Sequence, residues 1–240
     1  MSKVKRESDA YDKGLDRNLY EKILSHCGHK SNVYRNEIVY DIMKKKANNN
    51  VVLELGSQLW IRWIEQFKIK PNLIHCINIS KKELQHGIDY SNKTVTKPVF
   101  KIMDANYLEY ENEQFDVVFG GGMLHHLEFE RAVEEVIRVT KKDGIGIFVE
   151  PLNINLISKI IRYLTPKQRT IDETPLEKKH LNFLRNNAKC TFYYEQFFSI
   201  PLGLISVILF RKPDNFITKG VYKVLQAVGL VSGDSSKLIY

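Results

Sequence analysis

The sequence VVLELGSQLW (residues 51–60) joins a continuously apolar run to a glycine turn, and its first five residues read as a buried strand. Four more short apolar runs follow it along the chain, at 73–79, 99–103, 115–119 and 145–149. Most of them lack the alternation of apolar and polar residues that marks a strand with one solvent-exposed face, so we expect burial on both faces. Helical periodicity marks the intervals at 58–68, 81–90 and 128–141. Short buried strands that alternate with helices predict an α/β fold with a doubly wound, mostly parallel, Rossmann-like sheet.

The 240-residue chain divides by pattern into three parts, which we expect to pack as one compact domain. Residues 1–46 are expected to form a helical cap or lid, because apolar side chains recur there at helical spacing. Residues 47–151 hold the sheet, and residues 152–240 hold a helical insertion at 152–188, the remaining strands and a C-terminal helix. Whether VILFRKP (207–213) is the last strand of the sheet, or that strand is absent, stays open at this stage.

Composition and charge exclude several classes of protein. The formal charge is +8, but Lys and Arg are spread along the whole chain, so no nucleic-acid partner is expected. Three scattered cysteines without CxxC spacing predict neither a disulfide framework nor a zinc ribbon, which fits a reducing compartment. The polar start lacks the apolar core of a signal peptide, so we expect a cytoplasmic protein. The longest apolar run, 197–210, is shorter than the ~20 residues of a transmembrane helix, and Pro201 interrupts it.

Chemistry-bearing residues follow the predicted strands at the edge where a doubly wound sheet binds its ligands. Glu54 and Gly56 flank the first turn, Asn78 ends the second strand, and Asp104 follows the third. The fourth strand runs into a glycine-rich turn in the stretch FDVVFGGGMLHHL (115–127). This succession resembles that of class I S-adenosylmethionine-dependent methyltransferases, as does RVTKKDGIGIFVEPL (138–152) around the fifth strand. The resemblance covers residues 51–151 and implies S-adenosyl-L-methionine as the cofactor.

The same resemblance implies a set of cofactor contacts. Glu54 would lie near the methionine amino group, and the backbone of Gly56 and Ser57 would leave room for the cofactor. The further contacts are expected, in chain order, at Asn78 and Ile79 on the ribose side, Asp104 and Ala105 at the adenine, and Gly120 and Gly121 on the methionine side. The pattern departs from the family at three positions, because Gln58 and Trp60 replace glycines of the first turn and Asn78 replaces an acid.

Two histidines and a tyrosine are the candidates beside the transferred methyl group. His125 and His126 follow the fourth strand, and an imidazole titrates near neutral pH, which suits it to take a proton from the acceptor. The alternative for either ring is a hydrogen-bonded packing role. Tyr11 lies in a segment that resembles the lid of several such enzymes, which makes it a candidate cofactor contact. Glu150 is either a second candidate base or a residue that orients the next loop.

The methyl acceptor is predicted only by class. The leading interpretation is an O or N atom of a small molecule, such as a sugar, a glycan precursor or a secondary metabolite. A hydrophobic acceptor (lipid, quinone or polyketide) and a non-catalytic binding protein are the alternatives. Basic residues of the insertion, Arg162 and Arg169 among them, favour an anionic acceptor, and an amphipathic helix predicted over 217–228 leaves peripheral membrane contact open. No metal site is predicted, because the cluster HCGH (26–29) is too compact for tetrahedral ligation.

Overall fold

The structure is a computed structural model that describes the chain in several stretches. They are residues 3–13, 26, 37–56, 60, 64–65, 67–92, 97–153, 159, 163, 170, 172–193, 205–210, 215–216 and 219–220. The chain packs as two units, of which the first comprises Met1–Leu15, Val39–Leu152 and Arg169–Ala188, and the second Asp16–Ile38, Asn153–Gln168 and Lys189–Tyr240. The first unit holds the whole sheet and draws in segments from both sides of it in the sequence.

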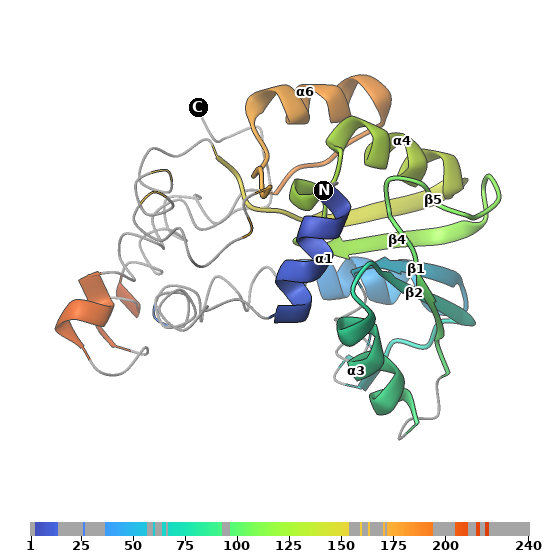
Figure 1. The fold of residues 1–240 in the computed structure, drawn as a ribbon, viewed down its shortest axis with the longest axis horizontal. Coiled ribbons are helices and arrows are strands. Elements are labelled where there is room, and N and C mark those ends of the chain that lie inside the picture. Colours follow the sequence, from blue (N-terminus) through green and yellow to red (C-terminus); the bar gives the residue numbers. More distant parts are fainter. Residues whose placement is uncertain are drawn as a thin grey trace. The chain divides into compact units, whose positions relative to one another are not determined.

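Five strands form one parallel sheet in the first unit (Figure 1). In chain order they are β1 (Val51–Leu55), β2 (Leu73–Asn78), β3 (Val99–Ile102), β4 (Phe115–Gly121) and β5 (Thr140–Val149). Their order across the sheet is β3-β2-β1-β4-β5, so the direction of winding reverses between β1 and β4. The predicted doubly wound fold is confirmed, and its ligand-binding edge is the one where β1 and β4 end.

Helices cover the sheet between the strands. Ser80 caps α3 (Lys81–Ser91), because its hydroxyl accepts the backbone N–H of Glu83 at 3.2 Å. The helix α4 (Phe129–Val139) buries one apolar face, and α6 (Lys178–Asn187) packs on it with the rings of Phe129 and His180 4.5 Å apart. Residues 37–46 are also helical, as predicted, and bury Met43.

Two hydrophobic clusters lie on the two faces of the sheet, because neighbouring residues of a strand point to opposite sides. Leu53 and Val118 belong to the cluster under α4, whereas Val52 and Val117 belong to the cluster with Met43. Phe115 would fall on the face of Val117 by simple alternation, yet it packs with Val118. A register shift between Phe115 and Val117 explains this change of face.

The two ends of the sheet differ from the sequence-based expectation. The edge strand β3 leaves most of its residues exposed, with Ile102 60% exposed, because no strand flanks it on its outer side in the described sheet. The last strand begins at Thr140 rather than at residue 145, and α4 ends at Val139 rather than at 141. The reason is that Thr140 pairs with Phe115 directly after the helix, so backbone pairing takes the place of a turn.

The N-terminal helix α1 (Lys3–Lys13) lies at the carboxyl ends of the strands (Figure 1). Ser8 donates to the carbonyl oxygen of Ile79 at 3.3 Å, and Asp12 accepts the hydroxyl of Ser80. On its other side, Arg6 forms a two-pronged ion pair with Asp172, with N–O distances of 2.7 and 2.8 Å. The helix thus joins the end of β2 to the segment before α6, which is the position expected of a lid.

Several predicted elements lie wholly or largely outside the described residues. They are the first helices of the range 15–46, most of the helix at 58–68, most of the insertion before residue 170, and the tail helix at 217–228. The strand considered for VILFRKP is wrong over its first residues, since residues 205–209 are helical. No helix in the described part of the chain is long and apolar enough to span a bilayer.

Candidate functional site

The turn after β1 requires a glycine. Gly56 has a φ of +87°, and its N–H donates to the carbonyl oxygen of Ile77 at 2.9 Å. A Cβ at this position would lie 2.5 Å from Sδ of Met123, so both the backbone conformation and the space exclude a side chain. The backbone here therefore passes close to the turn after β4. Ser57, the next expected contact, lies outside the described residues.

Glu54 organises this turn from inside the protein. Its side chain is 2% exposed, and its carboxylate accepts the N–H of Trp60 at 3.2 Å and the thiol of Cys76 at 3.7 Å. Trp60 itself is fully buried, against Phe100 and Tyr90. The departure from glycine at position 60 is thus explained by packing, because the indole fills space on the face of the sheet away from α4.

Asn78 ties the first two strand ends together. Its amide nitrogen donates to the carbonyl oxygen of Gly56 at 2.6 Å, and its amide oxygen accepts the N–H of Ser80 at 2.8 Å. An ionised acid at this position could not donate to Gly56. The amide oxygen has a second lone pair, so it keeps the capacity to accept a hydroxyl. Ile79 is placed beside it, with its carbonyl oxygen bound by α1.

Asp104 shapes the turn after β3. Its Oδ1 accepts both the backbone N–H and the side-chain amide of Asn106, each at 2.9 Å. Ala105, which lies between Asp104 and Asn106 in the sequence, is buried. Two residues of α4 fix the rest of this loop. Glu135 accepts the N–H of Leu108 at 2.7 Å, and Arg138 donates to the carbonyl oxygens of Leu108 and Tyr110. The hydrogen bond from Arg138 lowers the pKa of Glu135 below its ordinary value, so this clamp stays charged.

Three glycines carry β4 into the short helix η2 (Leu124–His126). A Cβ on Gly120 would lie 2.9 Å from the ring of Phe148, and Gly121 is the last residue of the strand. Gly122, which sequence reasoning did not single out, has a φ of +69° and donates to Val149 at 2.8 Å. The third glycine of the run was the available signal for this second left-handed turn.

Glu150 orients the loop after β4. Its Oε1 accepts the N–H groups of Met123 and Leu124, each at 2.9 Å. Its Oε2 lies 2.7 Å from Nδ1 of His125 and 3.4 Å from the backbone nitrogen of that residue. The carboxylate is 5% exposed. Of the two roles considered for Glu150, these contacts support the orienting one, because both oxygens are bound to the loop.

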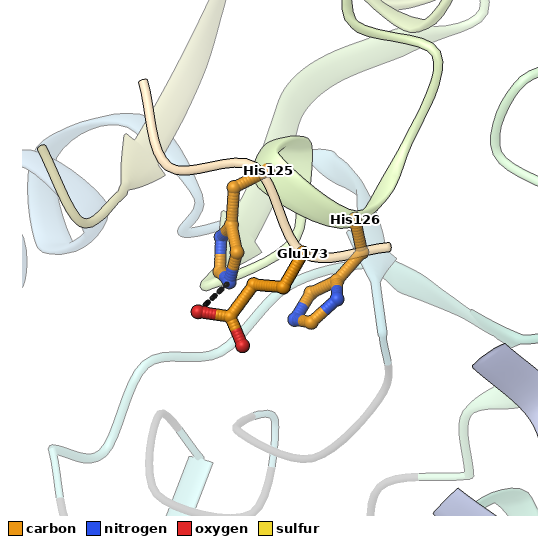
Figure 2. Close-up of side chains that lie close together, drawn as sticks. All are labelled: His125, His126 and Glu173. Atoms are coloured by element: carbon orange, nitrogen blue, oxygen red, sulfur yellow. Dashed lines mark ion pairs between the residues drawn. The ribbon is translucent and has the colours of Figure 1, made fainter. Parts of the chain in front are cut away.

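The two histidines meet residues from distant segments. Nε2 of His126 shares a hydrogen bond with the hydroxyl of Tyr11 at 3.0 Å, and its Nδ1 lies 3.0 Å from Oε2 of Glu7. Nε2 of His125 lies 3.9 Å from Oε1 of Glu173 (Figure 2). The two rings are 4.0 Å apart. The structure therefore joins Tyr11 to His126, and it adds Glu7 and Glu173, which the sequence analysis did not single out.

Comparison with known proteins identifies the fold's family. A family model described as a methyltransferase domain matches residues 53–148, which run from β1 to the end of β5. Residues 53–148 match a methyltransferase domain, in agreement with the resemblance to class I S-adenosylmethionine-dependent enzymes. The cofactor implied by this domain is S-adenosyl-L-methionine, as predicted.

Two curated proteins resemble parts of this chain. The uncharacterized protein MJ1252 of Methanocaldococcus jannaschii is 36% identical over 108 residues, which are 45% of this chain and 39% of that protein. The glycine/sarcosine/dimethylglycine N-methyltransferase of Actinopolyspora halophila is 29% identical over 82 residues, 33% of this chain and 14% of that protein. The chain thus spans well under half the length of these relatives.

Solved structures share the fold of this chain. A putative methyltransferase from Bacillus halodurans matches with a TM-score of 0.52 and 17% identity, over 66% of this chain and 69% of that one. The YcgJ protein of Bacillus subtilis matches with the same TM-score and 15% identity, over 79% and 82% of the two chains. The likeness extends beyond the segment that the family model covers.

The carboxyl edge of the sheet brings together most of the predicted site. Gly56, Asn78 and Ile79 are linked by hydrogen bonds among the ends of β1 and β2 and helix α1, and Gly120 lies next to Met123. Asp104 follows β3, whose end pairs with Asn78. Glu54 is buried beneath the turn after β1, with 2% of the residue exposed. Which of these residues touch the cofactor remains a prediction.

Proposed function

We propose that this methyltransferase transfers the methyl group of S-adenosyl-L-methionine to an O or N atom of a small molecule held beside Tyr11 and His126. The observation that carries the proposal is this pair, whose hydroxyl and Nε2 lie 3.0 Å apart next to the glycine turn after β4. One member comes from the lid helix and the other from the sheet, so they meet only when α1 covers the strand ends. Such an arrangement positions a proton acceptor where a class I fold presents its ligand.

The cofactor would bind across the ends of β1 to β4. Its methionine part would lie along the turns at Gly56 and Gly120, with Glu54 beneath the first of them and Gly121 beside the second. Its ribose would meet the amide oxygen of Asn78, and its adenine would meet Asp104 and Ala105. The positive φ of Gly56, in the turn after β1 at the ligand-binding edge of the sheet, supports this placement.

The protein's own contribution would be alignment and proton removal. When bound, the cofactor supplies a methyl group on a sulfonium, whose in-line displacement requires little further chemistry from the protein. An acceptor hydroxyl or ammonium must lose its proton, and Nε2 of His126 would accept it, directly or through the hydroxyl of Tyr11. His125 is 6% exposed and its Nδ1 is bound to Glu150, so it would position the loop rather than meet the acceptor.

The charges around the pair favour an amine as the acceptor. The carboxylates of Glu7, Glu150 and Glu173 are all within contact of the two imidazole rings. Their negative charge would attract an acceptor that arrives as an ammonium ion and gives its proton to His126. The matched relative from Actinopolyspora halophila, an N-methyltransferase of glycine and its methylated forms by name, agrees with this class.

Calorimetry and turnover test the two halves of the proposal. Titration of the full chain with S-adenosyl-L-methionine should give saturable binding, and no binding at millimolar cofactor would contradict the enzyme. Transfer of labelled methyl to a panel of small amines and hydroxyl compounds should fall about 10²- to 10⁴-fold in His126→Ala, with cofactor affinity retained. The matched control is His86→Ala, an exposed histidine on α3, which should keep full turnover. Unchanged turnover in His126→Ala would remove His126 from the proton transfer.

A further inference from the structure

Three side chains converge beside η2 with their polar ends together (Figure 2). One ligand atom each of His125, His126 and Glu173 lies within 4.8 Å of the others, and Nε2 of His125 is 3.9 Å from Oε1 of Glu173. Two imidazole nitrogens and one carboxylate oxygen are a ligand set of divalent zinc and iron sites. We propose that these three residues bind a divalent transition-metal ion, with zinc as the preferred member of the class.

The surroundings of both rings fix which nitrogen faces the ion. Nδ1 of His125 lies 2.7 Å from Glu150, and Nδ1 of His126 lies 3.0 Å from Glu7. A metal-binding histidine commonly gives its other ring N–H to a carboxylate, which sets the tautomer and raises the basicity of the ligand nitrogen. His125 has this carboxylate support in place, so it presents the lone pair of Nε2 to the common point with Glu173. Nε2 of His126 shares a hydrogen bond with the hydroxyl of Tyr11, so this ring would have to turn from that hydroxyl to bind the ion.

The contact between Glu7 and His126 supplies a second, independent observation. Their side chains are only 3% and 9% exposed, and Oε2 of Glu7 and Nδ1 of His126 are buried without a hydrogen bond, although they lie 3.0 Å apart. Buried polar atoms in this state carry a free-energy cost. A small rotation of the His126 ring, as its Nε2 turns onto a metal, would align Nδ1–H with the carboxylate and remove that cost.

The distances suit a small tetrahedral ion. Metal–ligand bonds of about 2.0–2.1 Å place neighbouring ligand atoms roughly 3.3 Å apart. The 3.9 Å between Nε2 of His125 and Oε1 of Glu173 would shorten by rotation of the Glu173 side chain, which is 13% exposed. The three ligand atoms, all within 4.8 Å of one another, would draw together on binding. The hydroxyl of Tyr11 lies 3.0 Å from Nε2 of His126 and would give up this hydrogen bond when the nitrogen binds the ion.

Metal binding would compete with methyl transfer. Nε2 of His126 has one lone pair, and the ion would use the same pair that is needed to accept the acceptor's proton. This consequence rests on the proposed function, whereas the site itself does not. We therefore expect zinc to inhibit turnover, with recovery when a chelator removes it.

Metal titration tests the site independently of methyl-transfer activity. The full chain is prepared without a polyhistidine tag and stripped of metal with a chelator. One equivalent of Zn²⁺ should bind, and Co²⁺ should give the visible absorption of a tetrahedral complex. Glu173→Gln and His125→Gln should each lower the affinity about 100-fold or more. The matched controls are Glu134→Gln and His86→Gln, which alter exposed residues of the same types and should bind as the unaltered chain does.

The result that would overturn the site is equally direct. Absence of Co²⁺ absorption and Zn²⁺ binding in the unaltered chain would refute it, and so would undiminished binding in Glu173→Gln, which would place the ion elsewhere. Glu173 lies in a partly exposed loop, so its variant keeps the test valid even if His125→Gln fails to fold. If the unaltered chain binds the metal as expected but transfers no methyl group, the result would count against the proposed function alone.

Discussion

Replacement of Glu150 should destabilise the protein more than replacement of any surface carboxylate. Its two oxygens take three contacts of 2.7–2.9 Å and one of 3.4 Å, from Met123, Leu124 and two nitrogens of His125. A hydrogen bond to a charged group contributes about 1.5–3 kcal/mol, and such contributions are not additive within one network. Allowing for relaxation of the loop, Glu150→Ala should lower the free energy of unfolding by about 3–5 kcal/mol, as for a broken buried ion pair.

Glu150→Gln separates charge from shape. The amide oxygen can keep the two backbone N–H groups, and the amide nitrogen then faces Nδ1 of His125, which must switch tautomer to accept it. The variant should therefore lose only about 1–2 kcal/mol. The same switch would place a proton on Nε2, so metal affinity should fall together with the small loss of stability.

Urea unfolding of the cofactor-free chain, followed by tryptophan fluorescence, to which buried Trp60 contributes, measures these differences. Glu134→Ala is the matched control, because this exposed carboxylate of α4 should contribute less than about 0.5 kcal/mol. A loss below about 1 kcal/mol in Glu150→Ala, or equal losses in the Ala and Gln variants, would show that the loop does not depend on these hydrogen bonds.

Three further perturbations have defined outcomes. Gly56→Ala should cost at least about 1–2 kcal/mol in urea unfolding and abolish cofactor binding in calorimetry, because of the φ of +87° and the 2.5 Å approach to Met123. Asp104→Ala should weaken the binding of S-adenosyl-L-methionine in the same assay while retaining turnover at saturating cofactor; unchanged affinity would move the adenine elsewhere. Burial, and then the charge of Lys101, lower the pKa of His75. The unfolded chain therefore binds a proton that the folded one resists, so stability should fall as the pH drops below about 6.5, and His75→Phe should flatten that fall. An equally steep fall in the variant would assign it to other groups.

The cofactor edge was predictable because its signals are local. A buried strand followed by a glycine or a polar residue is visible within ten residues, and the parallel sheet brings all such strand ends to one edge. For this reason Gly56, Asn78, Asp104 and Gly120 could be named before their positions were known. Their hydrogen bonds could not, since the amide of Asn78 donates to a residue 22 positions away.

The histidine cluster was only half predictable. His125 and His126 stood out by their place after the fourth strand, and Tyr11 by its place in a lid-like segment. The carboxylates of Glu7 and Glu173 were not singled out, because both residues lie far in the sequence from the histidines that they face. An ion pair between residues more than 100 positions apart leaves no trace in periodicity or composition.

The sequence by itself determined the class of fold and the edge of the sheet where a ligand belongs, since both depend on the local alternation of apolar runs and turns. The cofactor followed only from the resemblance of residues 51–151 to a known family. The tertiary structure alone decided which histidine meets Tyr11, that Glu150 holds the loop rather than faces a substrate, and that three carboxylates gather at two imidazole rings. The physical reason is that side-chain chemistry depends on what lies within about 3 Å, and only the packing of α1 and of the segment before α6 onto the sheet creates those distances.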